Sequence, residues 1–375
     1  MTKYQSGGTS DETHHPENQM IGKSVDELQT PAIVADIEAL EANLSLMADY
    51  FTGRHCRLRP HFKSHKCVTL AHHQLAAGNA NGITCAKVSE AEQLVSGGIK
   101  DILIANQVIG PEKVRRVAEL NRKAPVRLMV DSREGVTRIG AAAREAGVTV
   151  GVLVEVDIGM NRCGVPPGKP ALELAGLVTC TRGLRFDGLQ GYEGHLVTLE
   201  DYRERKRLAG KSIEKLIETR RTLENAGLPV SIVSAGGTGT YTITGNIEGI
   251  DEIQPGSYAL MDSFYKKVTP EFQNARYVAA TIISARGNKA VADVGLKGLG
   301  CEYGELVVAG RPEAKVLYVA EEHLPMQGLR ANAGDRIRLI PPHGCTTNNL
   351  YQRMWIARND IIEDVWPIEG RGCLE

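Results

Sequence analysis

Long hydrophobic runs, a strong excess of charge and paired cysteine motifs are all missing from this sequence. Its longest apolar runs, such as residues 151–156, are far shorter than the ~20 residues that a membrane-spanning helix needs. The 375 residues carry a formal net charge of −1, so nothing indicates binding to nucleic acid or to a charged membrane surface. These absences favour a globular protein that acts on small molecules, without a nucleic-acid or membrane partner.

The eight cysteines are scattered, without a Cys-x-x-Cys pair or any regular spacing. In a chain of this length, that pattern indicates free thiols in a reducing, cytoplasmic compartment. The first residues are polar and contain no apolar stretch, which is not typical of a signal peptide. We therefore expect residues 1–29 to be a disordered leader and extension, in which His14 and His15 are a solvated pair and not a metal site.

Eight short apolar and β-branched runs alternate with helix-like segments in the middle of the chain. The predicted strands span residues 57–63, 82–88, 101–107, 126–131, 150–157, 186–192, 230–235 and 252–261. The predicted helices span residues 89–96, with Ser89 as N-cap, 111–123, 133–146, 170–180 and 199–226, the last closed by Gly227. Eight such units are the number that closes a (β/α)8 barrel.

A doubly wound sheet would share this alternation, but two features argue against it. No Gly-x-Gly-x-x-Gly follows the first strand, and polar residues end almost every strand, not only those at one switch point. In barrels, the catalytic groups lie at the C-terminal ends of the strands. Here those ends carry Lys63, Lys87, Asn106, Asp131, Asp157, Tyr192, Gly236 and Tyr258.

From about residue 277 the pattern changes to short runs separated by Gly and Asn turns. Runs at 277–284, 290–293, 315–319, 336–339 and 353–358 have no long helical stretch between them, which predicts an antiparallel β domain. An apolar run at 30–36 precedes a helix over 38–50 and is a candidate to pair with that domain. We expect a barrel over residues 30–270 and a C-terminal β domain over 271–375.

Two motifs of the predicted barrel suit a phosphorylated cofactor. Lys63 ends the first strand, where burial in a barrel mouth would lower the pKa of its amine and make it nucleophilic. The glycine-rich run 234–240 follows the seventh strand, and Gly256-Ser257-Tyr258 lies in the eighth, where barrels usually bind phosphate. A lysine opposite a phosphate site is what pyridoxal 5′-phosphate (PLP) requires. Surface lysines and plain glycine turns are the alternatives.

Three further motifs carry candidate functional residues. Arg162, after the fifth strand, is either a surface cation or a fixed donor in a cofactor pocket. His195 follows the sixth strand and is either structural or an acid–base group that projects into the barrel mouth. In the β domain, His343 and Cys345 form a His-x-Cys step, which on an extended segment would suit zinc but is also compatible with a buried cysteine beside a turn.

Six motifs together resemble the metal-activated fold-type III PLP enzymes, which include D-threonine aldolase, 3-hydroxy-D-aspartate aldolase and eukaryotic-type D-serine dehydratase. The motifs are RPHFKSHK, DIGMNRCGV, QGYEGH, SAGGTGTY, IQPGSYALMD and PPHGCTTNNLY, in this order between about residues 30 and 372. The resemblance implies an alanine-racemase-like barrel in a homodimer, with each barrel mouth completed by the β domain of the partner.

The resemblance also assigns roles to individual residues. It implies that PLP is attached as a Schiff base to Lys63, with Arg162 and Tyr192 around its ring. Its phosphate would be held by backbone and hydroxyl groups of Gly237, Thr238, Gly256, Ser257 and Tyr258. A divalent metal would bind His343 and Cys345. Aldolases often carry Asp at the second of these positions, whereas Cys is more usual in D-serine dehydratases. A thiolate favours zinc, and a carboxylate suits manganese or magnesium.

The motifs around Tyr192, Thr238 and Ala259 resemble the aldolase branch. The predicted function is therefore a PLP- and metal-dependent lyase that cleaves D-3-hydroxyamino acids, such as D-threonine or 3-hydroxy-D-aspartate, to glycine and an aldehyde. Lys63 and His195 are the predicted catalytic residues, with His195 as the base. The alternative is a D-serine or 3-hydroxyaspartate dehydratase that yields an α-keto acid and ammonia. A metal-free racemase comes third, and the β domain argues against a PLP-carrying homeostasis protein.

Overall fold

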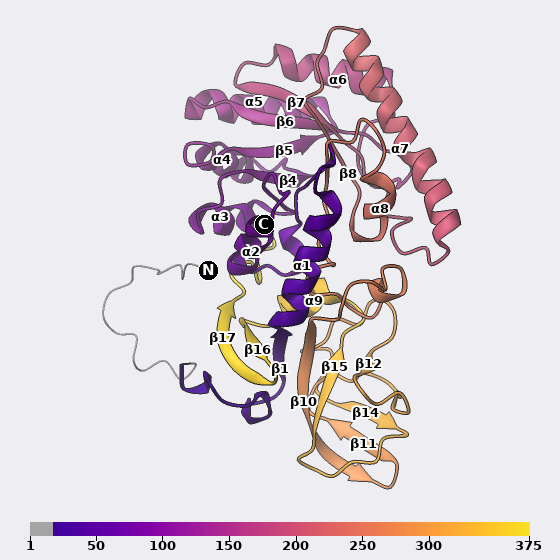
Figure 1. The fold of residues 1–375 in the computed structure, drawn as a ribbon. Coiled ribbons are helices and arrows are strands. Elements are labelled where there is room, and N and C mark those ends of the chain that lie inside the picture. Colours follow the sequence, from indigo (N-terminus) through magenta and orange to yellow (C-terminus); the bar gives the residue numbers. More distant parts are fainter. Residues whose placement is uncertain (1–17) are drawn as a thin grey trace.

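The structure is a computed structural model that describes residues 18–375, so most of the expected leader, with His14 and His15, lies outside the described residues. Two sheets make up the described chain (Figure 1). A parallel sheet with its helices forms one half of the molecule, and a mainly antiparallel sheet forms the other. The predicted fold class, a (β/α)8-type barrel with an antiparallel β domain, is confirmed.

The parallel sheet has eight strands in the order β2-β9-β8-β7-β6-β5-β4-β3. Isolated bridges from Leu58 to Ala80 and from His61 to Thr84 join its two ends, so the sheet curls round on itself. The bounds of the strands are β2 (Arg57–Leu58), β3 (Ile83–Cys85), β4 (Ile102–Gln107), β5 (Val126–Val130), β6 (Val150–Glu155), β7 (Leu184–Gln190), β8 (Ile232–Ala235) and β9 (Glu252–Ile253).

Helices cover the outside of this curled sheet, as the alternation predicts. They are α2 (Val68–Ala76), α3 (Val88–Ser96), α4 (Pro111–Leu120), α5 (Arg133–Ala146), α6 (Lys169–Cys180), α7 (Tyr202–Asn225) and the short α8 (Tyr241–Thr244). The predicted N-cap of α3 is wrong: the helix begins one residue before Ser89, and Lys87 is the N-cap. The Glu90 carboxylate accepts from the backbone N–H of Ala86 and of Lys87 and so closes this end.

The first predicted barrel strand is much shorter than its apolar pattern suggests. After β2 the chain turns into a 3-10 helix at Phe62–Ser64, so Lys63 lies on a turn beyond the strand and not on its last residue. The last strand, β9, is also only two residues long. Both segments bring the polar residues that follow them to the mouth of the barrel.

The second sheet contains strands from both ends of the chain. β1 (Ala32–Asp36) pairs antiparallel with β10 (Arg276–Arg286) and parallel with β16 (Arg353–Arg358). The other strands are β11 (Lys289–Ala292), β12 (Val307–Val308), β13 (Lys315–Val316), β14 (Leu324–Gln327), β15 (Arg336–Ile340) and β17 (Ile361–Pro367). The sequence patterns missed β12 and β14, which are short, and β17, which carries two adjacent acidic residues.

Helix α1 (Ile37–Phe51) connects the two halves and runs from β1 toward the barrel (Figure 1). Its N-cap is Asp36, whose carboxylate accepts from the backbone N–H groups of Glu38 and Ala39. The buried Asn43 donates to the backbone oxygens of Ala259 and Gln273, at 3.0 and 2.8 Å. This amide therefore ties α1 to the chain segment that follows the barrel.

The interior of the barrel contains a network of buried ion pairs at its N-terminal end. Arg59 bonds Glu252 at 2.8 Å and Asp101 at 2.7 Å, with only 2% of its side chain exposed. Arg127 joins the same Asp101 at 2.7 Å and Asp187 at 2.8 Å. Because the members come from different strands, this network fixes how the strands sit against one another and leaves the opposite end of the barrel for the cavity.

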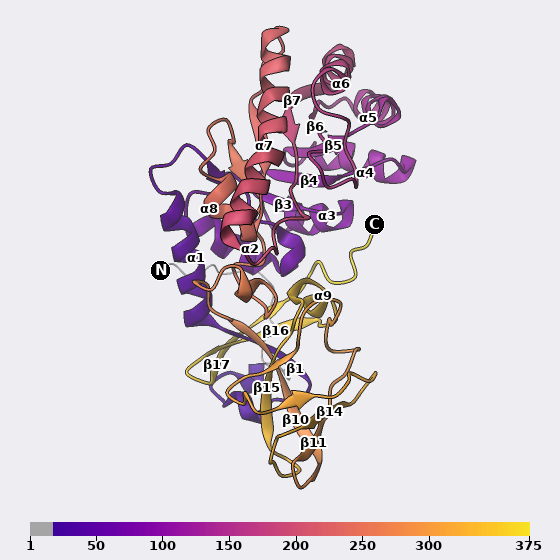
Figure 2. The ribbon, with the colours of Figure 1, turned by 90° about the vertical axis from the view of Figure 1, so that its right-hand side faces the viewer.

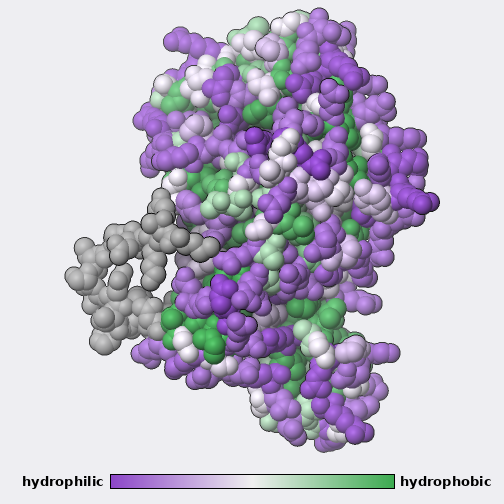
Figure 3. All heavy atoms as spheres, in the orientation of Figure 1, coloured by the Kyte–Doolittle hydropathy of each residue, from purple (hydrophilic) through white to green (hydrophobic). Residues whose placement is uncertain are grey.

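Hydrophilic side chains cover most of the face seen in Figure 3, and hydrophobic ones form scattered patches. Within residues 18–375, no helix is both long enough and apolar enough to cross a bilayer.

Candidate active site

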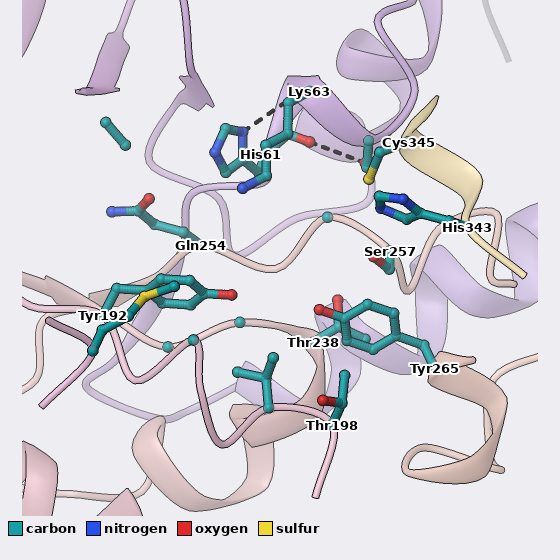
Figure 4. A pocket seen from close by; sticks show the side chains of 18 of the residues that line it. His61, Lys63, Tyr192, Thr198, Thr238, Gln254, Ser257, Tyr265, His343 and Cys345 are labelled. Atoms are coloured by element: carbon teal, nitrogen blue, oxygen red, sulfur yellow. Dashed lines mark hydrogen bonds between the residues drawn. The ribbon is translucent and has the colours of Figure 1, made fainter. Parts of the chain in front are cut away.

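A cavity of about 650 Å³ lies between the mouth of the barrel and the short helix α9 (Gly344–Asn349) of the second half. Figure 2 shows α9 at the junction of the two halves. Side chains from both halves face this cavity (Figure 4). Its walls include Lys63, Arg162, Tyr192, Thr238, Ser257, His343 and Cys345, which the sequence predicted, together with His61, Met160, Thr198, Gln254, Phe264, Tyr265, Tyr303 and Leu374, which it did not.

Lys63 extends from the turn after β2 into this cavity. Its side chain is exposed, because it points into the open cavity and not into the core. Desolvation by the surrounding walls lowers the pKa of its amine, and the charge of Arg162 acts in the same direction, whereas Cys345 opposes them. Exposure and a lowered pKa are compatible here, since protein surrounds the small volume of solvent that the side chain meets. The geometry thus gives Lys63 the character of a nucleophilic amine.

The neighbouring Lys66 also reaches the cavity wall but is committed to other partners. Its Nζ donates to the Glu90 carboxylate at 2.6 Å and to the backbone oxygen of Gly370 at 3.1 Å. Only 1% of the Glu90 side chain and 10% of the Lys66 side chain are exposed. Of the two lysines in the motif, Lys63 is therefore the free amine.

The glycine-rich run after β8 is held from behind by a buried carboxylate. Glu193, fully buried, accepts from Thr240 Oγ1 at 2.7 Å, from Thr244 Oγ1 at 2.5 Å and from the backbone N–H of Gly236 at 3.2 Å. The N–H of Gly237 in turn donates to Thr240 Oγ1. These bonds keep the run in one conformation, with Gly236 to Thr238 along the cavity wall.

The eighth-strand motif packs against the same run. Gly256 has no room for a side chain, because a Cβ would come within 3.0 Å of Ser64 Oγ and 3.1 Å of the His61 oxygen. Ser257 lines the cavity, whereas Tyr258 does not. The Tyr258 hydroxyl accepts from Gln74 Nε2 at 3.2 Å within the core, and only its backbone N–H reaches the run, donating to Thr238 Oγ1. In this structure the Tyr258 hydroxyl therefore points away from the cavity and bonds Gln74.

Two tyrosines point their hydroxyls toward the middle of the cavity (Figure 4). Burial raises the pKa of Tyr192 to about 12, with the Glu193 carboxylate acting in the same direction. Burial also raises the pKa of Tyr265 well above its ordinary value. Both therefore remain protonated donors near neutral pH. The Arg162 guanidinium lies over the Tyr192 ring, with its Cζ 5.7 Å from the ring centroid.

His343 and Cys345 lie next to each other on the side of the cavity opposite Tyr192 (Figure 4). They do not lie on an extended segment, as the sequence suggested: His343 is the N-cap of α9 and Cys345 is in its first turn. The pair still converges because the chain changes from strand-like to helical backbone between the two residues. His343 Nδ1 is 3.4 Å from Glu302 Oε1 and 3.3 Å from Thr346 Oγ1, which orients the ring.

His195 is not on the cavity wall. The side chain is exposed, and its ring lies beside Gly159 on the loop after β6, 3.5 Å from where a Cβ would be. This position gives no support to the expectation that it projects into the barrel mouth, and its role as the base stays a prediction. Lys87, Asn106, Asp131 and Asp157 also lie outside the cavity. Asp157 has a structural role, since it accepts from the backbone N–H groups of Gly159 and Asn161.

Comparisons with known proteins identify the family. The family model for the alanine racemase N-terminal domain matches residues 35–263, and that for a putative serine dehydratase domain matches residues 275–357. The 3-hydroxy-D-aspartate aldolase of Paracoccus denitrificans (strain Pd 1222) is 35% identical over 366 residues, which cover 94% of each chain. The chain belongs to the alanine-racemase-like family of PLP enzymes.

Solved structures and a more distant relative agree with this placement. The crystal structure of D-threonine aldolase from Filomicrobium marinum superposes with a TM-score of 0.92, at 37% identity, covering 95% of this chain and 99% of that one. The D-threo-3-hydroxyaspartate dehydratase of Delftia sp. (strain HT23) is 30% identical over 354 residues, covering 85% of this chain and 92% of that one. The relatives of this alanine-racemase-like protein are thus aldolases and dehydratases, which are lyases.

The residues of this alanine-racemase-like chain fit PLP. A free amine at Lys63 faces a glycine-rich run whose backbone allows close approach, and the hydroxyls of Thr238 and Ser257 lie on the same wall. The chain also offers a metal two ligands of suitable type at His343 and Cys345. Among the described residues, no cluster of three or more His, Cys, Asp or Glu side chains could hold a metal. A metal at this pair would therefore keep coordination positions open, as catalytic metals do.

Several residues of this cavity escaped the sequence reasoning. His61 and Gln254 lie inside the motifs RPHFKSHK and IQPGSYALMD. Their positions in the sequence, close to Lys63 and Ser257, could have predicted that they line the cavity. Phe264, Tyr265 and Tyr303 come from loops without any strand-end position. Glu193, in QGYEGH, carries no pattern that distinguishes a buried loop anchor from a surface carboxylate.

Proposed function

We propose that this protein is a PLP- and divalent-metal-dependent aldolase that cleaves D-3-hydroxyamino acids to glycine and an aldehyde. The observation that carries the proposal is the cavity itself, which has the free Lys63 amine and the glycine-rich run on the barrel side and the His343–Cys345 pair on the α9 side. The 3-hydroxy-D-aspartate aldolase and the D-threonine aldolase named above support it, because both align over almost the whole chain.

Lys63, the glycine-rich run, and Arg162 and Tyr192 around the cofactor ring would hold PLP. When bound, PLP supplies an electron sink for the bond that breaks at Cα. Thr238 and Ser257 would donate hydroxyl bonds to its phosphate, together with backbone N–H groups of the run. The protonated Tyr192 and Tyr265 would remain donors in the cavity, and Arg162 keeps a positive charge near them. Tyr258 would contribute only through its backbone.

His343 and Cys345 would hold the divalent metal, which would lower the pKa of the substrate β-hydroxyl and so prepare the break between Cα and Cβ. The Delftia dehydratase named above has been solved as a cysteine-to-alanine mutant in the metal-free form, which supports a cysteine-linked metal in such proteins. A thiolate favours zinc over manganese or magnesium. We propose zinc for this reason.

The β-hydroxyl proton must leave to a base inside the cavity. Lys63 meets this requirement better than the predicted His195, because its amine lies in the cavity with a lowered pKa, whereas the imidazole lies outside. Walls on both sides of the cavity restrict the water that could compete for the proton. We therefore assign the proton transfer to Lys63 and keep His195 as the alternative that a mutation can test.

A dehydratase that forms an α-keto acid and ammonia is the second candidate function. The observation that favours it is the Cys345 ligand, since the Delftia dehydratase has a cysteine whose alanine mutant was solved metal-free. Product analysis distinguishes the two. Incubation with D-threonine, D-serine and both D-3-hydroxyaspartates should release glycine and an aldehyde; ammonia with a keto acid from the same substrates would establish the dehydratase instead.

We further propose a cytoplasmic homodimer. The eight cysteines are all free in the structure, which suits a reducing compartment. Tyr303 on the cavity rim is 53% exposed, and Leu374 is 66% exposed. Large apolar side chains at the mouth of an active site suit a surface that a second copy covers. Light scattering at a range of concentrations would measure the oligomeric state, and a monomer at all of them would contradict the proposal.

A further inference from the structure

The last residues of the sequence contribute to the cavity, although the other residues of its wall lie far from them along the chain. Residues 369–375, here called the 369–375 segment, leave the antiparallel sheet after β17 and return to the barrel (Figure 1). They end beside α3, as Figure 1 shows for the position of the C-terminus. The segment therefore crosses from one half of the molecule to the other next to the cavity.

Hydrogen bonds fasten the start of this segment to the loop that carries Lys63. The N–H of Gly370 donates to the Lys66 oxygen at 2.8 Å, and Lys66 Nζ returns a bond to the Gly370 oxygen at 3.1 Å. Gly370 lies so close to the loop that a Cβ there would come within 2.6 Å of the Phe62 ring. The Glu369 carboxylate accepts from the N–H of Val68 at 2.9 Å.

The other end of the segment is fastened to two more elements. Ser89, in the first turn of α3, donates its N–H and its hydroxyl to the Glu375 oxygen at 3.1 and 2.9 Å. Arg116 on α4 pairs with the Glu375 carboxylate at 3.1 Å. The N–H of Gly372 donates to Asn349 Oδ1 at 3.0 Å, and Asn349 belongs to α9, the helix that begins at the metal pair.

Leu374 lies between these anchors and is one of the residues that line the cavity. With 66% of it exposed, this leucine contributes little to the core, so its place on the wall is not explained by packing. The rim near the metal pair is apolar as well: Tyr303 stacks on Phe264 with ring centroids 5.8 Å apart, and its edge meets the His343 ring at 5.0 Å.

We propose that Leu374 is a specificity-determining residue, which limits the size of the group carried by the substrate β-carbon. The inference rests on the proposed aldolase function. A metal held by His343 and Cys345 would bind the β-hydroxyl and so bring the β-carbon near the start of α9. The remaining substituent on that carbon would then face the neighbouring wall, and Asn349 of α9 holds the segment that carries Leu374.

The test compares two substrates that differ only in this substituent. They are D-threonine, with a methyl group on the β-carbon, and the corresponding β-phenyl amino acid. Leu374→Ala should raise kcat/KM for the phenyl substrate relative to D-threonine by roughly 10-fold, because a few methyl groups in an apolar pocket discriminate on this scale. Leu374→Trp should shift the ratio in the opposite direction. Leu350→Ala, which removes an exposed leucine directly after α9 and outside the cavity wall, should leave the ratio unchanged.

The possible failures are distinguishable. If the unmodified enzyme forms glycine but both Leu374 variants keep its substrate ratio, the role of Leu374 is overturned while the aldolase function stands. An equal shift in Leu350→Ala would also overturn it. If the unmodified enzyme forms glycine from neither substrate nor from the D-3-hydroxyaspartates, the proposed function falls, and this inference with it. Leu374 is exposed, so neither substitution at this position should prevent folding.

Discussion

The two sides of the cavity are built in different ways. On the barrel side, the glycine-rich run is fixed by the fully buried Glu193, and Lys66 is fixed by a buried ion pair with Glu90. On the α9 side, the backbone is also held by buried bonds: the N–H of Gly344 donates to Asp262 Oδ2 at 3.0 Å, and Asn348 Nδ2 donates to the Ser64 oxygen at 2.7 Å. The difference lies in the His343 ring, whose Nδ1 is 3.4 Å from the half-exposed Glu302 and 3.3 Å from Thr346.

The two sides would also have different tasks. The barrel side would hold PLP, whose chemistry is common to the aldolases and dehydratases that this chain resembles. The α9 side would hold the metal and face the β-carbon, where these reactions differ. A protein with a fixed cofactor half can change its reaction through a few residues of α9 and its surroundings.

The largest expected effect comes from the two lysines of the motif. Lys63→Ala should remove detectable activity and the visible absorbance of bound PLP, while thermal unfolding stays close to that of the unmodified protein. Lys66→Ala should do the reverse: it leaves the buried Glu90 without its ion-pair partner, which costs about 3–5 kcal/mol of stability. A borohydride-reducible chromophore that survives in Lys63→Ala would show that the attachment site is elsewhere.

The metal side is tested by Cys345→Ala. Activity should fall about 100-fold or more, since a catalytic metal contributes several kcal/mol to the transition state, while the PLP absorbance is retained. EDTA should act in the same way on the unmodified enzyme, and added divalent metal should restore turnover. Full activity in a preparation that elemental analysis shows to be metal-free would rule the metal out.

Replacing Cys345 by another type of metal ligand tests the metal side further. In Cys345→Asp, a carboxylate replaces the thiolate, so the metal that gives the highest activity should shift from zinc toward manganese. Turnover measured with a series of divalent metals in both proteins provides the answer. If the metal profile is the same in both, Cys345 is not a ligand.

A smaller effect is expected from the anchor behind the glycine-rich run. Glu193→Gln keeps the shape of the side chain but offers one acceptor oxygen in place of two, so one buried donor loses its partner at a cost of about 1–3 kcal/mol. The run should loosen, and PLP should dissociate roughly 10-fold more readily, as measured by fluorescence titration. The exposed Glu200→Gln is the control, and equal PLP affinity in the two variants would contradict the anchoring role.

The smallest effect should come from His195. A positioned general base usually contributes about 10²–10⁴-fold to the rate, whereas a histidine outside the cavity should contribute less than about 3-fold. His195→Ala therefore separates the two assignments by a simple rate measurement. A loss of about 10²–10⁴-fold would show that His195 is the base. Substrate deuterated at Cα should show little primary isotope effect; a large effect together with a keto-acid product would favour the dehydratase.

Much of the fold was readable from local pattern, because strand and helix periodicity depend on neighbouring residues. The alternation of apolar runs predicted all eight strands of the curled sheet, and the turn-rich pattern after residue 277 predicted the antiparallel sheet. Strand lengths were less accurate. The first predicted strand extends to Lys63, but β2 ends at Leu58 and the chain then enters a 3-10 helix at Phe62–Ser64.

For the site, too, the sequence predicted some features, and others depend on tertiary contacts. Motif and resemblance pointed to Lys63, to the glycine-rich run and to the His343–Cys345 pair, and the structure brings all of them to one cavity. The rotamer of Tyr258 and the outward position of His195 depend on contacts with Gln74 and with the loop after β6. No local pattern carries that information.

The sequence by itself determined which residues are able to attach a cofactor, cradle a phosphate and bind a metal, because these abilities belong to side-chain chemistry and to glycine backbone. Only the tertiary structure decided which of them meet. Lys63 and Cys345 are separated by about three quarters of the chain, and Leu374 reaches the cavity only because the 369–375 segment is fastened to α3, α4 and α9. Such meetings depend on packing between distant segments, which the spacing of residues along the chain does not express.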